Sequence, residues 1–332
     1  MRKTILGLDG PSVPAVGLGC MAMSGTYGRA DRTESIATIQ AALDAGINVL
    51  DTGDFYGMGH NELLIAEALA GRERDDVLIS VKFGAQRGPD GSWLGQDARP
   101  AAVKTALAYS LRRLQTDYLD IYRPARLDPQ VPIEETVGAI AEMVDAGYVR
   151  FIGLSEVGAD TIRRAAAVRP ICDVQIEYSL LSRGIEQTIL PACRELGIAI
   201  TAYGVLSRGL IGGSYAPGQG SDNEHDIRGR FPRFRGENLH HNLDLVGRLR
   251  AIAESKGASI AQLAFAWVLS RGDDIVPLLG SRTRAQLEDA LGARELNLGP
   301  EDLQRLEEAM PAEAVVGERY ESAQMARLDS ER

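Results

Sequence analysis

The sequence predicts one α/β domain over residues 1–332, a (β/α)8 barrel with an N-terminal β-hairpin and a long loop over its C-terminal mouth. Short, almost purely apolar runs recur along the chain, which is typical of parallel strands buried on both faces. Helical patterns separate these runs, and a glycine often stands between a helix and the next run, as at Gly46, Gly147 and Gly197. With 332 residues, 45% of them hydrophobic, the chain can fill one large core.

The first expected element is a small hairpin that closes the bottom of the barrel. Its first strand runs from Thr4 to Leu8, the chain turns at Asp9 and Gly10, and it returns at Val13. The eight barrel strands are then expected in order at residues 15–18, 47–50, 77–81, 119–122, 150–154, 172–176, 198–202 and 275–278.

Helical patterns lie between these strands. In the first, Asp31 and Glu34 are spaced as a capping pair, and apolar side chains from Ile36 to Leu43 keep to one stripe. Another helix is expected to begin at Pro100, because proline is favoured in a first turn. A strand and a helix that alternate through eight units are what a (β/α)8 barrel requires.

Two segments stand outside this pattern. Residues 212–242 are rich in Gly, Pro, Asn and Arg and are too long for a plain connection, so we expect a functional loop over the mouth. The tail after Pro311 has no strong periodicity. No shift in composition marks a domain boundary.

A doubly wound dinucleotide-binding fold is the competing architecture. Its Gly-x-Gly-x-x-Ala fingerprint is nominally present at residues 17–22. The stretch that follows, 23–28, contains two glycines and cannot open the helix that would receive a pyrophosphate. The barrel is therefore favoured.

Composition narrows the range of functions. A net charge of −10, with no run of Lys or Arg, speaks against nucleic-acid binding and against membrane-surface binding. The three cysteines are far apart and lack metal-ligand spacing, so we expect reduced core thiols and no metal site. We expect a cytoplasmic protein, because no secretory leader is recognisable and no segment approaches the roughly 20 apolar residues of a membrane span.

Polar residues follow several of the predicted strands. In a barrel these strand ends converge on one mouth, so Lys82 can pair with Asp51, and Tyr56 lies within reach of both. A cation beside a phenol favours the ionised form, so Lys82 is expected to lower the pKa of Tyr56 toward the range of a proton donor. The alternative is a structural ion pair beside a core aromatic, and the pattern leaves both readings open.

Five segments together resemble the aldo-keto reductases, in the bacterial and plant branch related to the potassium-channel β subunits. The resemblance covers nearly the whole chain, from Ala15 to Met310. The segments are Asp-Thr-Gly-Asp-Phe-Tyr-Gly from Asp51, Val-Pro-Ile-Glu-Glu-Thr from Val131, Ile-Gly-Leu-Ser-Glu-Val from Ile152, Val-Gln-Ile-Glu-Tyr-Ser-Leu from Val174, and Arg-Gly-Glu-Asn-Leu from Arg235.

The resemblance implies an NADPH-dependent reductase of a small-molecule carbonyl compound. It places Asp51, Tyr56 and Lys82 on three catalytic positions, with Tyr56 as the proton donor. The family's fourth catalytic residue, a His, falls on Ala125, and none of the four histidines is near it in sequence. Three consequences of the missing His are open. A water could fill the space and bridge to the carbonyl oxygen, Arg123 could turn inward as a cationic donor, or the wider pocket could admit a bulkier substrate.

The resemblance also implies a set of cofactor contacts. Ser155 and Gln175 would hold the nicotinamide carboxamide, and Tyr203 would stack on the ring. The remaining implied contacts are Asp51, then Gly204, Leu206, Arg208 and Gly209 along the pyrophosphate, and Gly280, Ser281, Arg282, Gln286 and Asp289 at the adenosine end; Met21, with Cys20, is expected at the floor of the nicotinamide pocket.

The cations near the adenosine end indicate a preference for NADPH over NADH. Arg282 and Arg284 stand at a predicted helix start, where the helix dipole disfavours cations unless an anion is bound, and no acidic ribose-binding residue is expected nearby. Two other functions stay open: an NADPH-binding regulatory module with little turnover, and a dehydrogenase that works toward alcohol oxidation.

Overall fold

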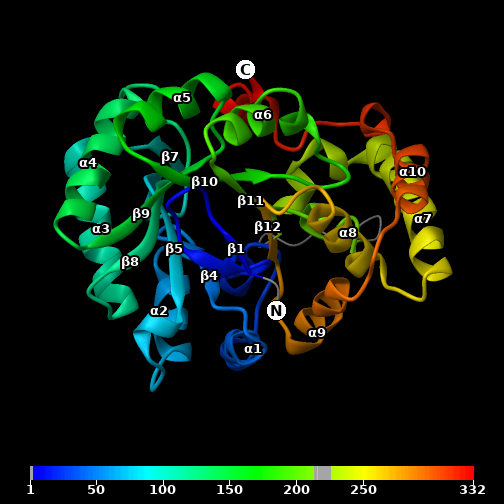
Figure 1. Cartoon of the computed structure of the whole chain (residues 1–332), viewed down its shortest axis with the longest axis horizontal. Helices are drawn as coiled ribbons and strands as arrows, with labels where there is room; N and C mark the ends of the chain where they lie inside the picture. The colour runs from blue at the N-terminus through cyan, green and yellow to red at the C-terminus, as the bar shows by residue number, and fades with distance from the viewer. Residues whose placement is uncertain (1–2, 213–214, 216–225) are drawn as a thin grey trace.

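The fold is a closed barrel of eight parallel strands (Figure 1). The computed structural model describes residues 3–212, 215 and 226–332. The strands follow one another around the barrel in the order β10-β11-β12-β3-β4-β5-β8-β9, so β12 closes the sheet by pairing with β3. Their bounds are β3 Gly17–Gly19, β4 Val49–Gly53, β5 Leu78–Phe83, β8 Leu119–Pro124, β9 Val149–Ser155, β10 Ile171–Glu177, β11 Ala199–Tyr203 and β12 Ile275–Leu279. The predicted barrel is confirmed, with strand ends displaced by a few residues.

Helices surround this barrel on its outer side (Figure 1). The predicted cap of the first helix is present, because the side chain of Asp31 accepts a hydrogen bond from the Glu34 amide at 2.7 Å. The helices are α1 Arg32–Asp44, α2 His60–Ala68, α3 Pro100–Leu114, α4 Ile133–Asp145, α5 Ala159–Val168, α6 Ile189–Glu195, α7 Gly236–Ser255, α8 Ile260–Leu269, α9 Arg284–Leu291, α10 Pro300–Ala309 and α11 Ser322–Met325. No helix in the described ranges is long and apolar enough to cross a membrane.

The N-terminal hairpin closes the bottom of the barrel, as predicted. Strand β1 (Lys3–Ile5) pairs antiparallel with β2 (Ser12–Pro14). Leu6 and Val13 are buried beside side chains from the starts of the barrel strands, in a cluster separate from the main core. The hairpin thereby keeps water out of the lower end of the barrel.

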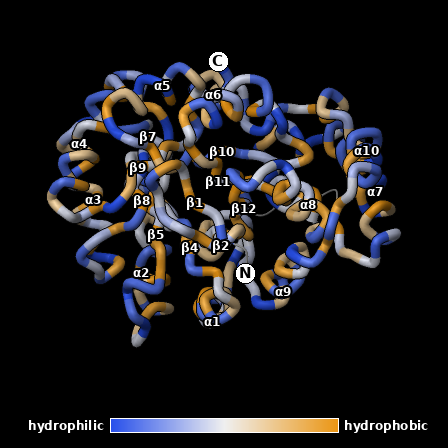
Figure 2. The backbone as a smooth tube through the Cα atoms, in the orientation of Figure 1, coloured by the Kyte–Doolittle hydropathy of each residue, from blue (hydrophilic) through white to orange (hydrophobic). Residues whose placement is uncertain are grey.

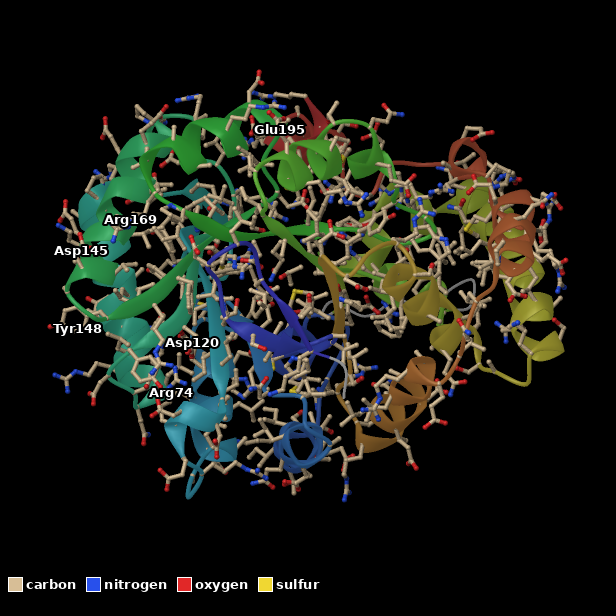
Figure 3. The ribbon with its side chains drawn as sticks, in the orientation of Figure 1. Arg74, Asp120, Asp145, Tyr148, Arg169 and Glu195 are labelled. Atoms are coloured by element: carbon tan, nitrogen blue, oxygen red, sulfur yellow. The ribbon has the colours of Figure 1, made fainter. Side chains whose placement is uncertain are left out.

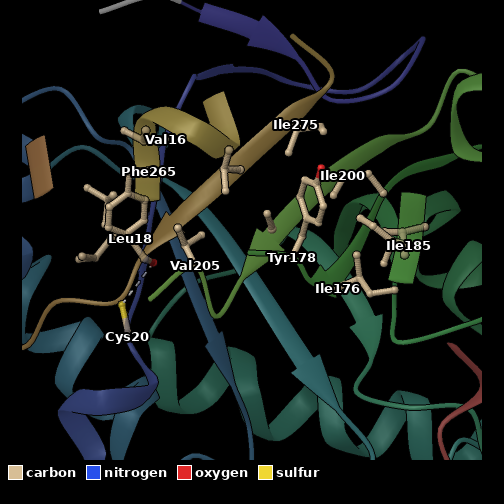
Figure 4. Packing of buried hydrophobic residues seen from close by; sticks show 14 of the residues in the cluster. Val16, Leu18, Cys20, Ile176, Tyr178, Ile185, Ile200, Val205, Phe265 and Ile275 are labelled. Atoms are coloured by element: carbon tan, nitrogen blue, oxygen red, sulfur yellow. Dashed lines mark hydrogen bonds between the residues drawn. The ribbon is translucent and has the colours of Figure 1, made fainter. Parts of the chain in front are cut away.

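The main core lies between the barrel strands and the helices. Phe265 of α8 packs with Val16 and Leu18 at the β3 side of the barrel (Figure 4). Figure 2 shows hydrophobic and hydrophilic residues alternating along α3 and α4, as expected for helices with one face on the sheet. The three cysteines are free and buried.

The prediction for the long loop needs correction. The predicted loop 212–242 is too long, because α7 already begins at Gly236, where Glu237 stands in the first turn and Leu239 and Asn242 turn inward. Residues 213–214 and 216–225 of this loop lie outside the described residues. The Gly-rich segment 86–96 contributes to a short antiparallel hairpin, β6 (Ala85–Arg87) with β7 (Trp93–Gln96).

Ion pairs occur both on the outer surface and inside the barrel. On the outer surface Arg169 pairs with Asp145, whose nearest atoms are 2.7 Å apart, whereas the Asp120 carboxylate that pairs with Arg74 is buried; all four residues are labelled in Figure 3. Inside, Nη1 of Arg123 lies 2.9 Å from Oδ2 of Asp173, and both side chains are almost completely shielded from solvent. A charge in such a place depends on its partner far more than an exposed charge does.

The difference in burial between these pairs predicts that two matched substitutions lower the free energy of unfolding by different amounts. Asp173→Asn leaves the guanidinium of Arg123 buried without a counter-charge and should lower the free energy of unfolding by about 3 to 5 kcal/mol. Asp145→Asn breaks an exposed pair and should change it by about 1 kcal/mol or less. Urea unfolding of both variants and the parent tests the difference; equal losses would contradict the account of the inner pair.

Candidate active site

The ends of neighbouring strands bring the expected polar residues to one rim of the barrel. Asp51 lies on β4 and Lys82 at the end of β5, which pair in parallel. Gln175 on β10 is opposite Ser155 of β9, and Tyr203 ends β11 on the other side of β10. Residues from five strands therefore form one site.

Asp51 is the centre of this site. Its Oδ1 lies 2.5 Å from Nζ of Lys82, and its Oδ2 accepts hydrogen bonds from Nε2 of Gln175 at 2.6 Å and from Oγ of Ser80 at 3.1 Å. All four side chains are buried. Burial lowers the pKa of Lys82, and the adjacent Asp51 carboxylate opposes that shift. The carboxylate thus holds a lysine in a place where an unpaired ammonium would be costly.

Tyr56 lies above this pair, in the turn after β4. Its ring centroid is 5.1 Å from Nζ of Lys82. Burial, and after it the negative charge of Asp51, raise the pKa of Tyr56 well above its ordinary value, while Arg126 acts in the opposite direction. The expected lowering of the Tyr56 pKa by Lys82 is wrong, because burial, and after it the charge of Asp51, raise this pKa.

The position expected for the catalytic His has no polar side chain. Ala125 is 2% exposed. Arg123 does not swing toward the mouth, as one alternative proposed, because it is held inside the barrel by Asp173 and by a hydrogen bond to Oγ of Ser80 at 3.0 Å.

Arg126 lies at the mouth instead, and sequence reasoning missed it. Its Nη1 donates to the carbonyl oxygen of Ala125 at 2.6 Å, and its Nη2 donates to the hydroxyl of Tyr320 at 3.2 Å. The sequence did contain a signal for this placement, because Arg126 directly follows Ala125, the position expected for the catalytic His. Tyr320 belongs to the aperiodic tail and gave no signal of its own.

The nicotinamide end of the expected cofactor site fits that group. The hydroxyl of Ser155 is buried, and it has no hydrogen-bond partner among the described residues. A buried hydroxyl without a partner is rare and suits a ligand that supplies one. Met21 lies partly buried in the short helix Met21–Ser24 that follows β3. Tyr203 is partly exposed at the rim, as a ring that stacks on a ligand should be.

The loop after β11 is held in an unusual backbone conformation. Ser207 and Arg208 have positive φ angles of 46° and 57°, beside Gly204 at 69° and Gly209 at 91°. Non-glycine residues adopt this region at a cost of roughly 1 to 3 kcal/mol, and such strain is often found at ligand sites. The guanidinium of Arg208 turns away from the loop to Glu177, at 2.9 Å. The backbone around Leu206 is therefore what this loop offers to a pyrophosphate.

The adenosine end contains an acid that the sequence did not lead us to expect. Arg284 is paired with Glu34 of α1, with Nη2 and Oε2 2.9 Å apart, so the prediction of no nearby acidic residue is wrong. The amide of Arg282 donates to Oε1 of Gln286 at 3.1 Å. Gly280 and the buried Ser281 precede this turn, and Asp289 accepts a hydrogen bond from Gln262 at 3.2 Å.

The C-terminal tail packs on the mouth. Arg319 pairs with Glu156 at 2.5 Å, with Glu331 at 2.7 Å and with Glu177 at 3.4 Å. Burial alone would raise the pKa of Glu156, but the Arg319 guanidinium overcomes it and holds that pKa below its usual range. Tyr320 lies 3.0 Å, hydroxyl to hydroxyl, from Tyr203. The tail therefore supplies side chains to the rim of the site.

A model of the aldo/keto reductase family matches residues 15–311. The chain belongs to this family. Probable aldo-keto reductase 1 of Glycine max is 42% identical to this aldo/keto reductase over 322 residues, which are 95% of the chain and 90% of the relative. The family uses nicotinamide cofactors and acts on small-molecule carbonyl compounds, so the protein is an oxidoreductase.

Solved structures show the same fold. This aldo/keto reductase is similar to a glycerol dehydrogenase from Gluconobacter oxydans, with a TM-score of 0.82 and 28% identity over 93% of this chain and 96% of that one. It is also similar to an aldo-keto reductase from Bacillus halodurans in its holo form, with a TM-score of 0.77 and 28% identity over 94% of this chain and 97% of that one.

Asp54, in the same turn as Tyr56, carries a second perturbed carboxyl. Its Oδ1 is buried and has no partner among the described residues. Burial, and after it the charge of Glu62, raise the pKa of Asp54 to about 7, while Arg113 opposes them.

This raised pKa predicts how stability changes with pH. In the unfolded chain an Asp titrates near pH 4, so between about pH 4 and 7 only the folded state keeps the proton on Asp54. The parent should therefore lose stability, relative to Asp54→Asn, as the pH rises through that window, by up to about 1.4 kcal/mol per pH unit. Urea unfolding of both proteins at pH 5 and pH 8 tests this; parallel changes would contradict the raised pKa.

Proposed function

We propose that this protein reduces aldehydes or activated ketones to alcohols with NADPH, and that Tyr56 is the proton donor. The observation that carries the proposal is the grouping of Tyr56 with the buried Lys82–Asp51 pair at the rim that also holds the partnerless hydroxyl of Ser155. A buried ion pair is an expensive structure, and here it lies next to a phenol at the mouth of a barrel, where such folds place their chemistry.

In this proposal Tyr56 protonates the carbonyl oxygen, and the Lys82–Asp51 pair stabilises the phenolate that this leaves. The hydroxyl of Tyr56 is protonated at neutral pH, so it can give a proton to a carbonyl oxygen as negative charge develops there. Lys82, fixed by Asp51, then lies close enough to stabilise the phenolate that remains. The reduced nicotinamide, when bound, supplies the hydride for the carbonyl carbon.

Other residues would hold the cofactor in place. Ser155 and Gln175 would bind the carboxamide and Tyr203 would cover the ring, while the strained loop from Gly204 to Gly209 would offer backbone groups to the pyrophosphate. Excluding water from this rim would strengthen the interactions that orient the reacting groups.

Removing the hydroxyl of Tyr56 should stop the reaction without emptying the cofactor site. Tyr56→Phe should lower kcat for an aldehyde by about a hundredfold or more, because general acid catalysis typically contributes that much. NADPH affinity, measured by fluorescence titration, should change little, since the cofactor contacts named above are kept. Lys82→Met should also lower kcat, because it leaves Asp51 buried without its partner.

The same comparison separates the competing functions. A regulatory module would bind NADPH but reduce no carbonyl compound in the parent protein. Full turnover in Tyr56→Phe would show that another group donates the proton and would contradict the role given to Tyr56.

We further propose that NADPH is preferred over NADH, with Arg282 and Arg284 binding the 2′-phosphate. Two charge-assisted contacts, at about 1.5 to 3 kcal/mol each, predict at least tenfold tighter binding of NADPH. Because Glu34 now holds Arg284, Glu34→Gln should tighten NADPH binding further and leave NADH binding unchanged. Fluorescence titrations of parent and variant with both cofactors test this; equal affinities in the parent would contradict it.

A further inference from the structure

Arg126 differs from the other guanidiniums at the barrel mouth. Arg208 and Arg233 both lie against Glu177, and Arg319 is paired with Glu156. Arg126 is partly buried, yet no carboxylate of the described residues lies within ion-pair distance of it.

Its hydrogen bonds leave most of its donors free. A guanidinium has five N–H donors, and the described residues engage only two of the nitrogens, through the carbonyl of Ala125 and the hydroxyl of Tyr320. Burial opposes the charge of Arg126, but a guanidinium stays protonated in proteins, and among its charged neighbours the Glu156 carboxylate favours the cation. A partly buried cation with free donors and no carboxylate in direct contact is suited to bind an anion.

Arg126 lies near the groups that are proposed to react. Its charge acts on Tyr56, the proposed proton donor, and its Cζ lies 5.9 Å from the ring centroid of Tyr320. The hydroxyl of Tyr320 in turn lies 3.0 Å from that of Tyr203, the residue expected against the nicotinamide. The guanidinium therefore lies beside Tyr320, one contact from Tyr203, and near enough to Tyr56 for its charge to act on that residue.

The charged side chains around Arg126 leave a local excess of positive charge at the mouth. Four guanidiniums, those of Arg126, Arg208, Arg233 and Arg319, share three carboxylates, those of Glu156, Glu177 and Glu331. The chain as a whole has a net charge of −10, so this excess is local to the mouth. It would attract a negatively charged substrate to the site.

We propose that the preferred substrates are carbonyl compounds that also carry a carboxylate, and that Arg126 binds this carboxylate with the hydroxyl of Tyr320. A planar guanidinium matches a carboxylate through two parallel hydrogen bonds, so the contact would orient the carbonyl as well as bind it. The proposal rests on the proposed function, because it names the substrate class of the same site.

The pyrophosphate of the cofactor is the other anion that could reach this region. The strained loop expected to bind it follows β11, whereas Arg126 follows β8 and contacts the tail. Arg126 also acts on Tyr56, whose partner is the substrate. The substrate carboxylate is therefore the occupant that the geometry favours.

A pair of aldehydes that differ only in charge tests the proposal. The probes are 4-carboxybenzaldehyde and its methyl ester, methyl 4-formylbenzoate, and the quantity measured is the ratio of their kcat/KM values with NADPH. The parent should favour the acid by about tenfold or more, mainly through KM, since one charge-assisted pair is worth at least that much. Arg126→Met should bring the ratio close to one, and Arg126→Lys, which keeps the charge, should retain part of it.

Two further measurements make the outcome specific. Arg112→Met, on the outer side of α3, removes an exposed arginine with no ion pair among the described residues and should leave the ratio as in the parent. Calorimetric titration with terephthalate, which does not depend on turnover, should show binding to the parent and to Arg112→Met and a loss of about tenfold or more in Arg126→Met.

The possible results separate the proposal from the function on which it rests. An equal rate for acid and ester in the parent, or an unchanged ratio in Arg126→Met, would overturn the role of Arg126. A weaker NADPH affinity in Arg126→Met, with the ratio kept, would overturn it in favour of the pyrophosphate. If neither aldehyde is reduced by the parent, the proposed function fails, and terephthalate binding lost in Arg126→Met would still support the anion site.

Discussion

Closure of the parallel sheet between β12 and β3 is the constraint on which the site depends. Because every barrel strand runs the same way, the ends of all eight reach one rim, and residues far apart in the chain become neighbours there. Asp51 and Gln175 are separated by 124 positions yet share a hydrogen bond of 2.6 Å. Residues at strand ends and in the turns that follow them meet at this rim, which is why Tyr56, in the turn directly after β4, lies above Lys82.

Charged side chains inside the barrel are shielded from water, so each of them needs a partner of opposite charge. Asp51 compensates Lys82, and Asp173 compensates Arg123, while burial, and after it the charge of Asp51, raise the pKa of Tyr56. The tyrosine therefore keeps its proton in the structure, and Lys82 would assist its release only as negative charge develops on the phenol oxygen. Arg126 has no carboxylate of the described residues within ion-pair distance, although the charge of Glu156 acts on it from farther away, and the substrate class proposed above follows from this missing ion pair.

Local patterns sufficed to predict the barrel and the Asp51–Lys82 pair, because buried parallel strands are marked by short apolar runs and their ends lie at fixed places. The approach of Glu34 to Arg284 could not be predicted in the same way, since it joins α1 to the start of α9, 250 positions apart. The tail around Tyr320 has no periodicity, so its position over the mouth depends on tertiary contacts alone. The pKa of Tyr56 likewise depends on which charge lies nearest after folding.

Transfer of deuterium is the measurement that tests the central claim most directly. The parent protein is incubated with NADPH deuterated at the transferred position of C4 and with 4-carboxybenzaldehyde, and the product is examined by NMR. A carbonyl reductase predicts deuterium on the carbinol carbon of the alcohol, in proportion to the NADPH consumed. Binding of NADPH without any deuterated alcohol from this or other aldehydes would contradict the account and indicate a protein that binds the cofactor but does not use it.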